Sequence, residues 1–228
     1  MKILCTICAR GKSKGLKNKN IKKIKDKSLS LYSIEQARKS KIFDKIVFST
    51  DSKSILNLVK NKVDHAIKRP SKLASDKAAK IPAIQHALLE SEKHFEQQFD
   101  VVIDLDVTSP LRSINDIKNE YKKFLKNKNS NLFSVNLSKK NPYYNMVKII
   151  NNVPQLVMKS KKIFNSRQVA PKIYEVNSSI YIWKRKSLLN LKLFNDKTGF
   201  YEMPAKRSID IDSRFDFDLV KYLIKSNK

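Results

Sequence analysis

The chain contains few glycines, cysteines and acidic residues, and it has no long apolar run. In 228 residues there are 3 glycines, 2 cysteines and 1 tryptophan. No apolar stretch approaches the roughly 20 residues that a membrane helix requires. The apolar opening at residues 2–8 is shorter than the apolar core of a secretory signal and has no small-residue cleavage site. We therefore expect one cytoplasmic globular domain, residues 1–228, with no membrane partner.

The two cysteines, Cys5 and Cys8, form a Cys-x-x-Cys pair. A structural zinc site needs a second Cys or His pair at matching spacing, and the sequence has none. Both cysteines also fall within a stretch that is typical of a β-strand. Buried free thiols are therefore a better interpretation than a zinc site.

The chain is strongly basic: it has 48 lysines and arginines but only 21 acidic residues, which gives a formal net charge of +27. A basic domain of this kind is typical of proteins that bind polyanions, nucleic acid included. However, only eight of these cations are arginines, and the lysines are spread along the whole chain rather than gathered in one basic arm. We therefore favour a small polyanionic substrate over nucleic acid, with a basic RNA-binding module as the alternative.

Apolar periodicity alternates between strand-like and helix-like along the chain. The strands are expected at residues 2–8, 45–51, 64–70, 100–107, 131–138 and 175–183, and the helices at 30–40, 52–61, 80–95, 114–127 and 213–225. Ser113 and Asp116 are a suitable start for the fourth helix. This alternation predicts an α/β fold with a mostly parallel sheet covered on both faces. Residues 139–172 interrupt it, which suggests an excursion from the sheet.

The loop at residues 9–22, ARGKSKGLKNKNIK, follows the first strand and holds two of the three glycines. Ligands of open parallel sheets bind outside the carboxyl ends of the strands. Gly11 and Gly15 would let backbone amides approach phosphate, and Arg10, Lys14 and Lys19 would supply positive charge. The loop is neither a Walker A nor a GxGxxG motif. A solvated basic loop with two turn glycines is the alternative.

A second candidate site lies near the C-terminus, in RSIDIDSRFDFD at residues 207–218. Alternation along a strand would place Asp210 and Asp212 on one side. Two carboxylates on one face suit Mg²⁺, which takes one or two protein carboxylates and completes its shell with phosphate and water. A solvated strand edge is the alternative. Asp216 and Asp218 are expected to begin the last helix, where acids complement the helix dipole.

Several motifs, in their order and spacing, make the chain similar to the acylneuraminate cytidylyltransferases, which make CMP-activated nine-carbon sugar acids. They cover nearly the whole chain: ARGKSKGLKNKNIK, FSTD, KRPSKLASD, VTSPLR, SRQ, NSSIYIW and RSIDIDSRFDF. The resemblance implies a Rossmann-like sheet of the nucleotide-diphospho-sugar transferase type and a homodimer formed partly through residues 139–172. It also implies Mg²⁺-dependent attack of a sugar's anomeric hydroxyl on the α-phosphate of CTP.

The resemblance also assigns roles to matching positions. The implied nucleotide-binding residues, those for triphosphate included, are Arg10, Ser13, Lys14, Gly15, Lys19, Asn20, Arg69 and Lys80, and the implied metal ligands are Asp210 and Asp212. Of these, Arg10, Lys19 and Asp212 are the expected catalytic residues. Such residues suit phosphoryl-type transfer, which depends mainly on positioning and charge neutralisation.

Sugar contacts are implied for Asp106, Arg167, Asn177 and Tyr181. Arg167 is the candidate for the sugar carboxylate, which a guanidinium can hold bidentately, whereas Tyr181 could equally pack in the core. Asp106 stands where many sialic acid enzymes have glutamine. An amide can donate and accept hydrogen bonds, whereas an ionised carboxylate can only accept them. With Lys80 in place of a small hydroxyl residue, this resembles the legionaminic acid branch. CMP-N-acetylneuraminate and CMP-Kdo synthetases are the alternatives.

Overall fold

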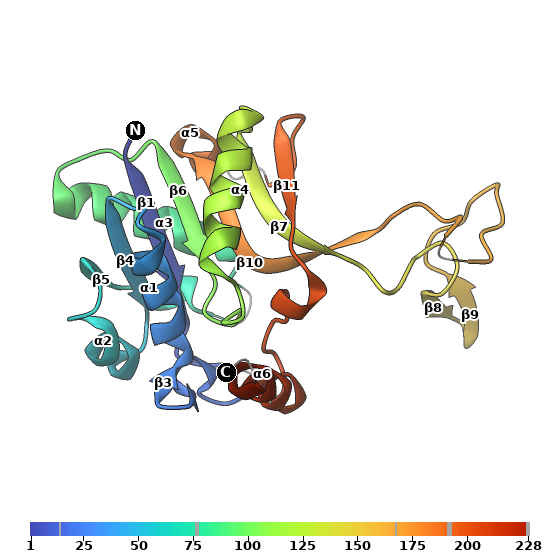
Figure 1. The fold of residues 1–228 in the computed structure, drawn as a ribbon, viewed down its shortest axis with the longest axis horizontal. Helices are drawn as coiled ribbons and strands as arrows, with labels where there is room; N and C mark the ends of the chain where they lie inside the picture. Colours follow the sequence, from blue (N-terminus) through green and yellow to red (C-terminus); the bar gives the residue numbers. More distant parts are fainter. Residues whose placement is uncertain (14, 76–77, 167, 191–192, 227–228) are drawn as a thin grey trace.

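The computed structural model describes residues 1–228 except 14, 76–77, 167, 191–192 and 227–228 (Figure 1). Its centre is a seven-stranded sheet in the order β11-β7-β10-β6-β1-β4-β5. The bounds of these strands are β1 Ile3–Cys8, β4 Lys45–Thr50, β5 His65–Lys68, β6 Val101–Leu105, β7 Asn131–Leu137, β10 Tyr174–Lys184 and β11 Thr198–Glu202. Only β10 runs antiparallel to its neighbours. The predicted α/β fold with a mostly parallel sheet is confirmed.

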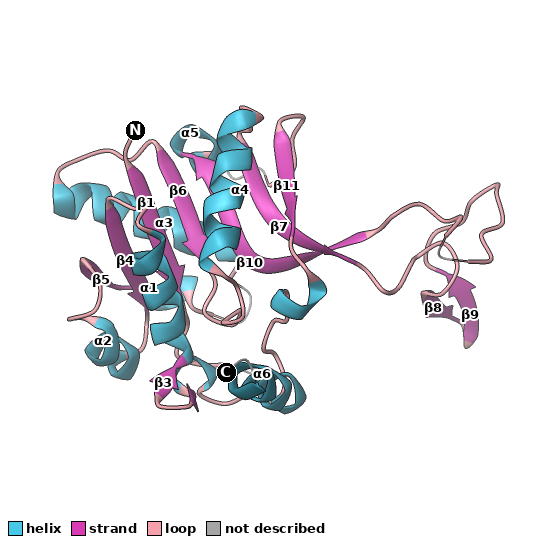
Figure 2. Ribbon diagram, in the orientation of Figure 1, coloured by secondary structure: helices cyan, strands magenta, loops and turns pink. Residues whose placement is uncertain are grey.

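Helices cover both faces of this sheet (Figure 2). Their bounds are α1 Leu29–Ser40, α2 Lys53–Val59, α3 Lys80–Phe95, α4 Ile114–Lys126, α5 Arg185–Leu189 and α6 Arg214–Ser226, and the three 3₁₀ turns are η1 Lys19–Ile21, η2 Ser71–Leu73 and η3 Ala205–Arg207. Residues of α1, α2, α4 and α6 pack on one face, while those of α3 and α5 pack on the other. Successive β1 residues alternate between these two cores, because side chains alternate along a strand.

Local sequence signals explain the buried face of α3 and the start of α4. In α3, apolar side chains at 83, 84, 87 and 88 form one buried stripe. In α4, Ser113 and Asp116 form a capping box, since each side chain bonds the other residue's backbone N–H. The capping box confirms the predicted start of α4.

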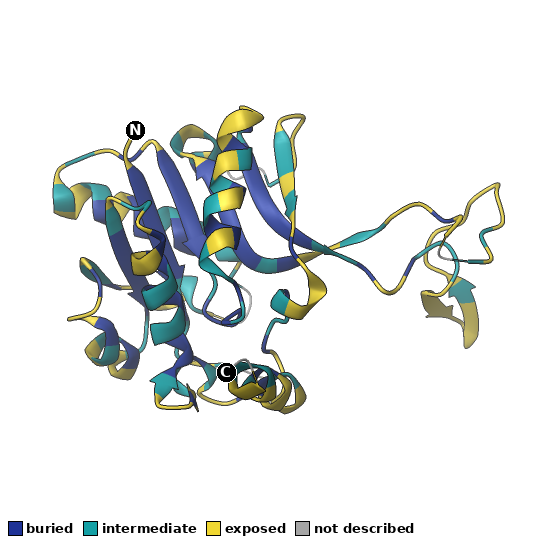
Figure 3. Cartoon of the chain, viewed as in Figure 1, coloured by how far each residue is buried: buried dark blue, intermediate teal, exposed yellow. Residues whose placement is uncertain are grey.

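Residues 139–172 extend away from the sheet as an arm (Figure 1). The arm carries a two-stranded hairpin, β8 Val147–Ile150 and β9 Val153–Leu156. A second small hairpin, β2 Lys23–Ile24 and β3 Lys27–Ser28, follows the glycine-containing loop. Burial is continuous along the central strands, whereas most of the arm is exposed (Figure 3).

The cysteines and the last helix can be compared with the sequence predictions. Cys5 is buried and Cys8 partly buried, and both are free thiols. Burial raises the pKa of both thiols, that of Cys8 to about 12, which favours the protonated form at neutral pH. Asp216 lies in the first turn of α6, as predicted, and accepts from the backbone N–H of Ser213 at 2.7 Å. Asp218 lies beyond that turn and pairs with Arg214, so the prediction is wrong for Asp218. None of the helices in the described ranges is both long and apolar enough to cross a membrane.

Candidate active site

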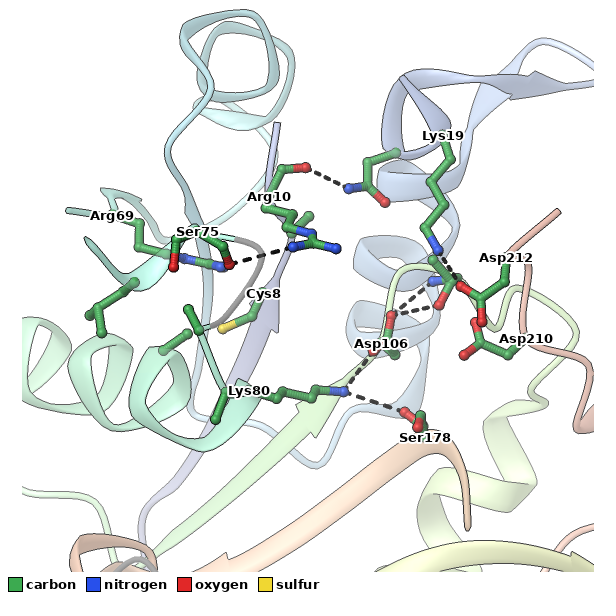
Figure 4. A pocket seen from close by; sticks show the side chains of 17 residues that line it. Cys8, Arg10, Lys19, Arg69, Ser75, Lys80, Asp106, Ser178, Asp210 and Asp212 are labelled. Atoms are coloured by element: carbon green, nitrogen blue, oxygen red, sulfur yellow. Dashed lines mark hydrogen bonds and ion pairs between the residues drawn. The ribbon is translucent and has the colours of Figure 1, made fainter. Parts of the chain in front are cut away.

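A pocket of about 300 Å³ opens at the carboxyl ends of the parallel strands (Figure 4). The residues that line it include Arg10, Lys19, Asn20, Arg69, Lys80, Asp106, Asp210 and Asp212. Ser13 and Gly15 line an adjoining hollow. The structure therefore brings most of the sequence-predicted site residues together at the edge of the sheet where ligands of such folds bind. Lys14 and Arg167 lie outside the described residues.

The loop glycines are explained by close packing. A Cβ atom on Gly15 would lie 2.1 Å from the carbonyl oxygen of Asp212, and one on Gly11 would lie 2.8 Å from Cβ of Ser52. No glycine has a positive φ, so backbone conformation does not require them. Gly15 therefore allows the loop after β1 to touch the backbone of the C-terminal carboxylate segment, and the two candidate sites in the sequence are one site.

Lys19 joins the same two segments through its ammonium group. Its Nζ donates to the carbonyl oxygen of Ile211 at 2.7 Å and to Oδ1 of Asp212 at 2.8 Å. Nearby, the Nδ2 group of Asn20 donates to the carbonyl oxygen of Arg10 at 2.8 Å, which fixes the backbone of the loop. The hydroxyl of Ser13 donates to the carbonyl oxygen of Leu16. These contacts hold the loop in shape around the pocket.

The two arginines of the pocket come from different loops. Arg69, directly after β5, is buried, and its guanidinium donates to the carbonyl oxygen of Ser49 at 2.7 Å and to its hydroxyl at 3.1 Å. Arg10 reaches across the pocket toward the carbonyl oxygen of Ser75 at 3.5 Å. Together with Lys19 they place three cations around the opening, which suits a polyanionic ligand.

The segment that carries Asp210 and Asp212 is irregular, so the predicted strand is wrong. Ile211 is nevertheless buried, and its N–H donates to the carbonyl oxygen of Thr108 at 3.0 Å. The segment is therefore anchored to the turn after β6 instead of joining the sheet. This anchor turns Ile211 inward and leaves Asp212 exposed, whereas Ile209 and Asp210 are both partly buried, so the alternation predicted for a strand holds only in part.

Asp210 has the electrostatic character of a cation ligand. Its Oδ1 atom is buried and has no hydrogen-bond partner among the residues that the structure describes. Burial, and then the charge of Asp106, raises the pKa of Asp210 to about 6, so the carboxylate is destabilised by its surroundings. A divalent cation would relieve this, since hard cations bind carboxylate oxygen. The described residues contain no cluster of three or more His, Cys, Asp or Glu that could hold a metal. Two carboxylates are enough for Mg²⁺ when phosphate and water complete its shell.

Lys80 and two carboxylates form the deeper wall. Its Nζ lies 2.6 Å from Oδ2 of Asp106 and 3.1 Å from Oδ2 of Asp104. Burial alone would raise the pKa of Asp106, but Lys80 and the N–H and hydroxyl of Thr108 hold it at about 2. Asp106 is therefore ionised at neutral pH, as the acceptor role requires. Lys80, predicted as a nucleotide contact, is engaged by these carboxylates.

Two residues predicted to contact sugar are placed differently. The ring of Tyr181 is buried and stacks on Trp183 with centroids 5.4 Å apart, and Lys80 Nζ lies 4.6 Å from its centroid. Asn177 is buried and does not line the pocket in the part of the chain that is described. Its amide accepts from Ser134 at 2.6 Å and donates to Ser208 at 2.9 Å. Asn177 therefore connects the sheet to the segment that leads to Asp210.

Sequence reasoning missed three residues that shape this site. Asp104 is fully buried and accepts from the hydroxyl of Thr6 at 2.9 Å; its spacing of two from Asp106 was a usable signal. Arg112 is 2% exposed and donates to the carbonyl oxygens of Ser179 at 2.6 Å and Asp106 at 3.1 Å, so it fixes the turn that carries Asp106. Ser178 lines the pocket, and no local sequence signal marks it.

Comparisons with known proteins give consistent results. A family model described as Cytidylyltransferase matches residues 4–225. The chain is 49% identical over 225 residues to CMP-N,N'-diacetyllegionaminic acid synthase of Campylobacter jejuni, covering 97% of this chain and 94% of that protein. It is 48% identical over 226 residues to Post-translational flagellin modification protein B of Campylobacter coli, covering 98% and 95%. A solved CMP:2-keto-3-deoxy-manno-octonic acid synthetase complexed with CTP shares the fold over the full length of both chains, with a TM-score of 0.74 at 15% identity.

Proposed function

Because the chain belongs to the cytidylyltransferase family, we propose that it activates a nonulosonic acid with CTP, giving the CMP-sugar and pyrophosphate. One observation carries this proposal: the cationic loop after β1 and the Asp210–Asp212 segment meet at Gly15 and Lys19 in a single pocket. A cationic loop beside paired carboxylates is what a nucleoside triphosphate and its counterion need.

In this proposal the chain's own residues bind and orient the nucleotide. Arg10, Ser13, Gly15 and Lys19 surround the triphosphate, and Asn20 and Arg69 lie toward the nucleoside. Lys14 is assigned to the triphosphate by the family resemblance alone. Asp210 and Asp212 would hold Mg²⁺, which when bound neutralises charge on the phosphates. The pocket aligns the sugar's anomeric hydroxyl with the α-phosphorus. A bond forms between that oxygen and phosphorus, the bond to the bridging oxygen breaks, pyrophosphate leaves, and the hydroxyl proton passes to solvent.

Asp106 supports a legionaminic-type acid as the substrate. Its carboxylate stays ionised beside Lys80, so it can accept hydrogen bonds from amide N–H or hydroxyl groups on the sugar. The name of the relative that is 49% identical points to the same class. Arg167 remains our candidate for the sugar carboxylate, and Asn177 and Tyr181 our candidates for further sugar contacts, Asn177 after a side-chain rearrangement.

We also propose that the protein is a cytoplasmic homodimer and that residues 139–172 form part of the interface. Val147, Ile149 and Leu156 of the hairpin are 57%, 63% and 37% exposed. An isolated two-stranded hairpin is marginal in water and needs a covering partner. A second copy of the arm would bury these side chains.

Pyrophosphate release tests the proposed function directly. Purified protein, CTP and Mg²⁺ are combined with N-acetylneuraminic acid, di-N-acetyllegionaminic acid, pseudaminic acid and Kdo in turn. We expect the highest kcat/KM with the legionaminic acid. Highest activity with N-acetylneuraminic acid or Kdo would overturn the sugar assignment. No release with any sugar, together with tight salt-sensitive RNA binding, would favour the RNA-binding alternative that the charge of +27 suggests.

The metal assignment is tested on the same assay with matched variants. Asp210→Asn and Asp212→Asn should each lower kcat by at least about 100-fold, because each removes a carboxylate at the nucleotide phosphates. Asp218→Asn is the control, since Asp218 lies on α6 and pairs with Arg214 at 2.7 Å. Full Mg²⁺-dependent activity in Asp212→Asn would contradict the assignment.

A further inference from the structure

Ser178 has an unusual backbone conformation for a strand residue. Its φ is 56° within β10, at the point where pairing with β7 shifts register between Val176 and Tyr181. This left-handed region is unfavourable for residues with a Cβ atom, which crowds the neighbouring carbonyl oxygen. Of the described non-glycine residues with positive φ, Ser178 alone lies in a strand of the central sheet. Strain of this kind points to a functional site.

The left-handed turn places Ser178 in the wall of the pocket (Figure 4). Its carbonyl oxygen faces Lys80 Nζ at 3.4 Å, and its Oγ accepts a long contact from the Tyr181 hydroxyl at 3.4 Å. That contact uses the tyrosine proton, so the O–H proton of Ser178 can be donated to a ligand in the pocket. In Figure 4, Ser178 lies beside Lys80 and Asp106, on the opposite side of the pocket from Arg69.

We propose that Ser178 is a specificity-determining residue whose hydroxyl contacts the sugar acid. Glycine would suit this backbone better, yet it would remove the Ser178 hydroxyl from the pocket. The other hydroxyl beside Asp106, that of Thr108, already donates to Oδ1 of Asp106 at 2.9 Å. With serine at position 178, the sugar end of the pocket has a hydrogen-bond donor, Ser178, next to an acceptor, Asp106. Sugar acids with acyl-amino and hydroxyl substituents offer partners for both. This inference rests on the proposed function, because it places the sugar beside Lys80 and the nucleotide beside Arg10 and Arg69.

Two substitutions separate the hydroxyl from the backbone. Ser178→Ala removes the hydroxyl and keeps the strain, whereas Ser178→Gly removes both. Lys128→Gly is the matched control, because Lys128 has a φ of 52°, is exposed, and follows the end of α4. Each protein is assayed for kcat/KM with the sugar panel, KM for CTP, and the melting temperature.

We expect Ser178→Ala and Ser178→Gly to lower kcat/KM for the preferred sugar by about 3- to 10-fold, with KM for CTP unchanged within about twofold. Ser178→Gly and Lys128→Gly should raise the melting temperature by about 2–4 °C, and Ser178→Ala should not. Lys128→Gly should leave kcat/KM unchanged. Ser178→Ala with wild-type kcat/KM for every sugar would overturn the role of the hydroxyl. Wild-type protein that is inactive with every sugar would overturn the proposed function and this inference together.

Discussion

The guanidinium of Arg207 donates two hydrogen bonds to the carboxylate of Asp116, from Nε to Oδ2 at 2.8 Å and from Nη2 to Oδ1 at 2.9 Å. Asp116 belongs to α4 and is 1% exposed, whereas Arg207 ends η3, three residues before Asp210. Bidentate pairs of this kind fix geometry as well as adding energy. The pair therefore anchors the start of the carboxylate segment to α4, and the contact between Asn177 of β10 and Ser208 anchors it to the sheet.

Arg207→Met should therefore reduce catalysis through misplacement of Asp210. We expect kcat to fall roughly 10- to 100-fold, because small displacements at a reacting centre are costly, and the free energy of unfolding to fall by about 1–2 kcal/mol, because a buried carboxylate loses a partner that is itself partly exposed. The measurements are kcat as a function of Mg²⁺ concentration and urea unfolding. Arg214→Met, which removes an exposed arginine on α6, should change neither. Wild-type kcat and Mg²⁺ dependence in Arg207→Met would show that this anchor is dispensable.

Glu120 and Asp116 lie one turn apart on α4 and should have opposite effects on stability as pH changes. Both carboxyl oxygens of Glu120 are buried, with no hydrogen-bond partner in the described part of the chain, and burial, followed by the charge of Asp116, raises the pKa of Glu120 well above 4.5. The folded protein therefore favours the protonated form of Glu120. The contribution of Glu120 to the free energy of unfolding is fully present below about pH 4.5 and is lost as the pH rises through the pKa of the folded state. Glu120→Gln should match wild type near pH 4.5 in urea unfolding and be more stable above it.

Asp116 provides the comparison of opposite sign. Burial would raise its pKa, but Arg207 and Ser113 lower it below 3.8. Its contribution is therefore present above about pH 4 and is lost as pH falls through the folded pKa. Asp116→Asn should be less stable than wild type at pH 7, with the difference shrinking below pH 4. A difference between wild type and Glu120→Gln that does not vary with pH would mean that Glu120 titrates normally.

The two loop glycines should respond differently to alanine. In Gly15→Ala the new Cβ meets the backbone of Asp212, which cannot rotate away. We expect kcat/KM for CTP to fall by roughly 100-fold as the loop and carboxylate segment separate. In Gly11→Ala the new Cβ meets the side chain of Ser52, so Gly11→Ala with Ser52→Gly should recover most of the activity lost in Gly11→Ala. Equal activity of the single and double variants would exclude this contact as the cause.

Sequence periodicity was sufficient to predict the fold because burial dictates it. The helix expected at residues 80–95 has these same bounds in the structure, since its apolar stripe and the polar residues around it match one buried face. The same periodicity failed at residues 208–212. There, the backbone of the buried Ile211 bonds to the turn after β6 and does not pair with a strand of the sheet. Apolar alternation indicates which side chains are buried, but it does not indicate whether the segment pairs with a strand.

The candidate site was predictable where chemistry is local and hidden where it depends on tertiary contacts. Cations and glycines in one loop, and two aspartates at a spacing of two, are visible in the sequence. In contrast, the guanidinium of Arg112 donates to Ser33 of α1 and Ser179 of β10, which lie 79 and 67 residues away in the chain, and these bonds place it against the turn that carries Asp106. The φ of Ser178 likewise follows from the register shift in β10, which no neighbouring residue signals.

The arm offers a test of assembly that is independent of catalysis. Strand register places Val147 opposite Leu156 and Ile149 opposite Pro154, so one face of the hairpin is wholly apolar and exposed. Ile149→Asp should convert the proposed dimer to monomer in sedimentation velocity, because a carboxylate would be buried in the interface without a partner. Lys148→Asp, on the opposite face of the same strand, should leave the dimer intact. Both variants should have the wild-type melting temperature, since the arm contributes little to either core. A wild-type monomer at micromolar concentration, or a dimer that tolerates Ile149→Asp, would mean that this face is covered in some other way.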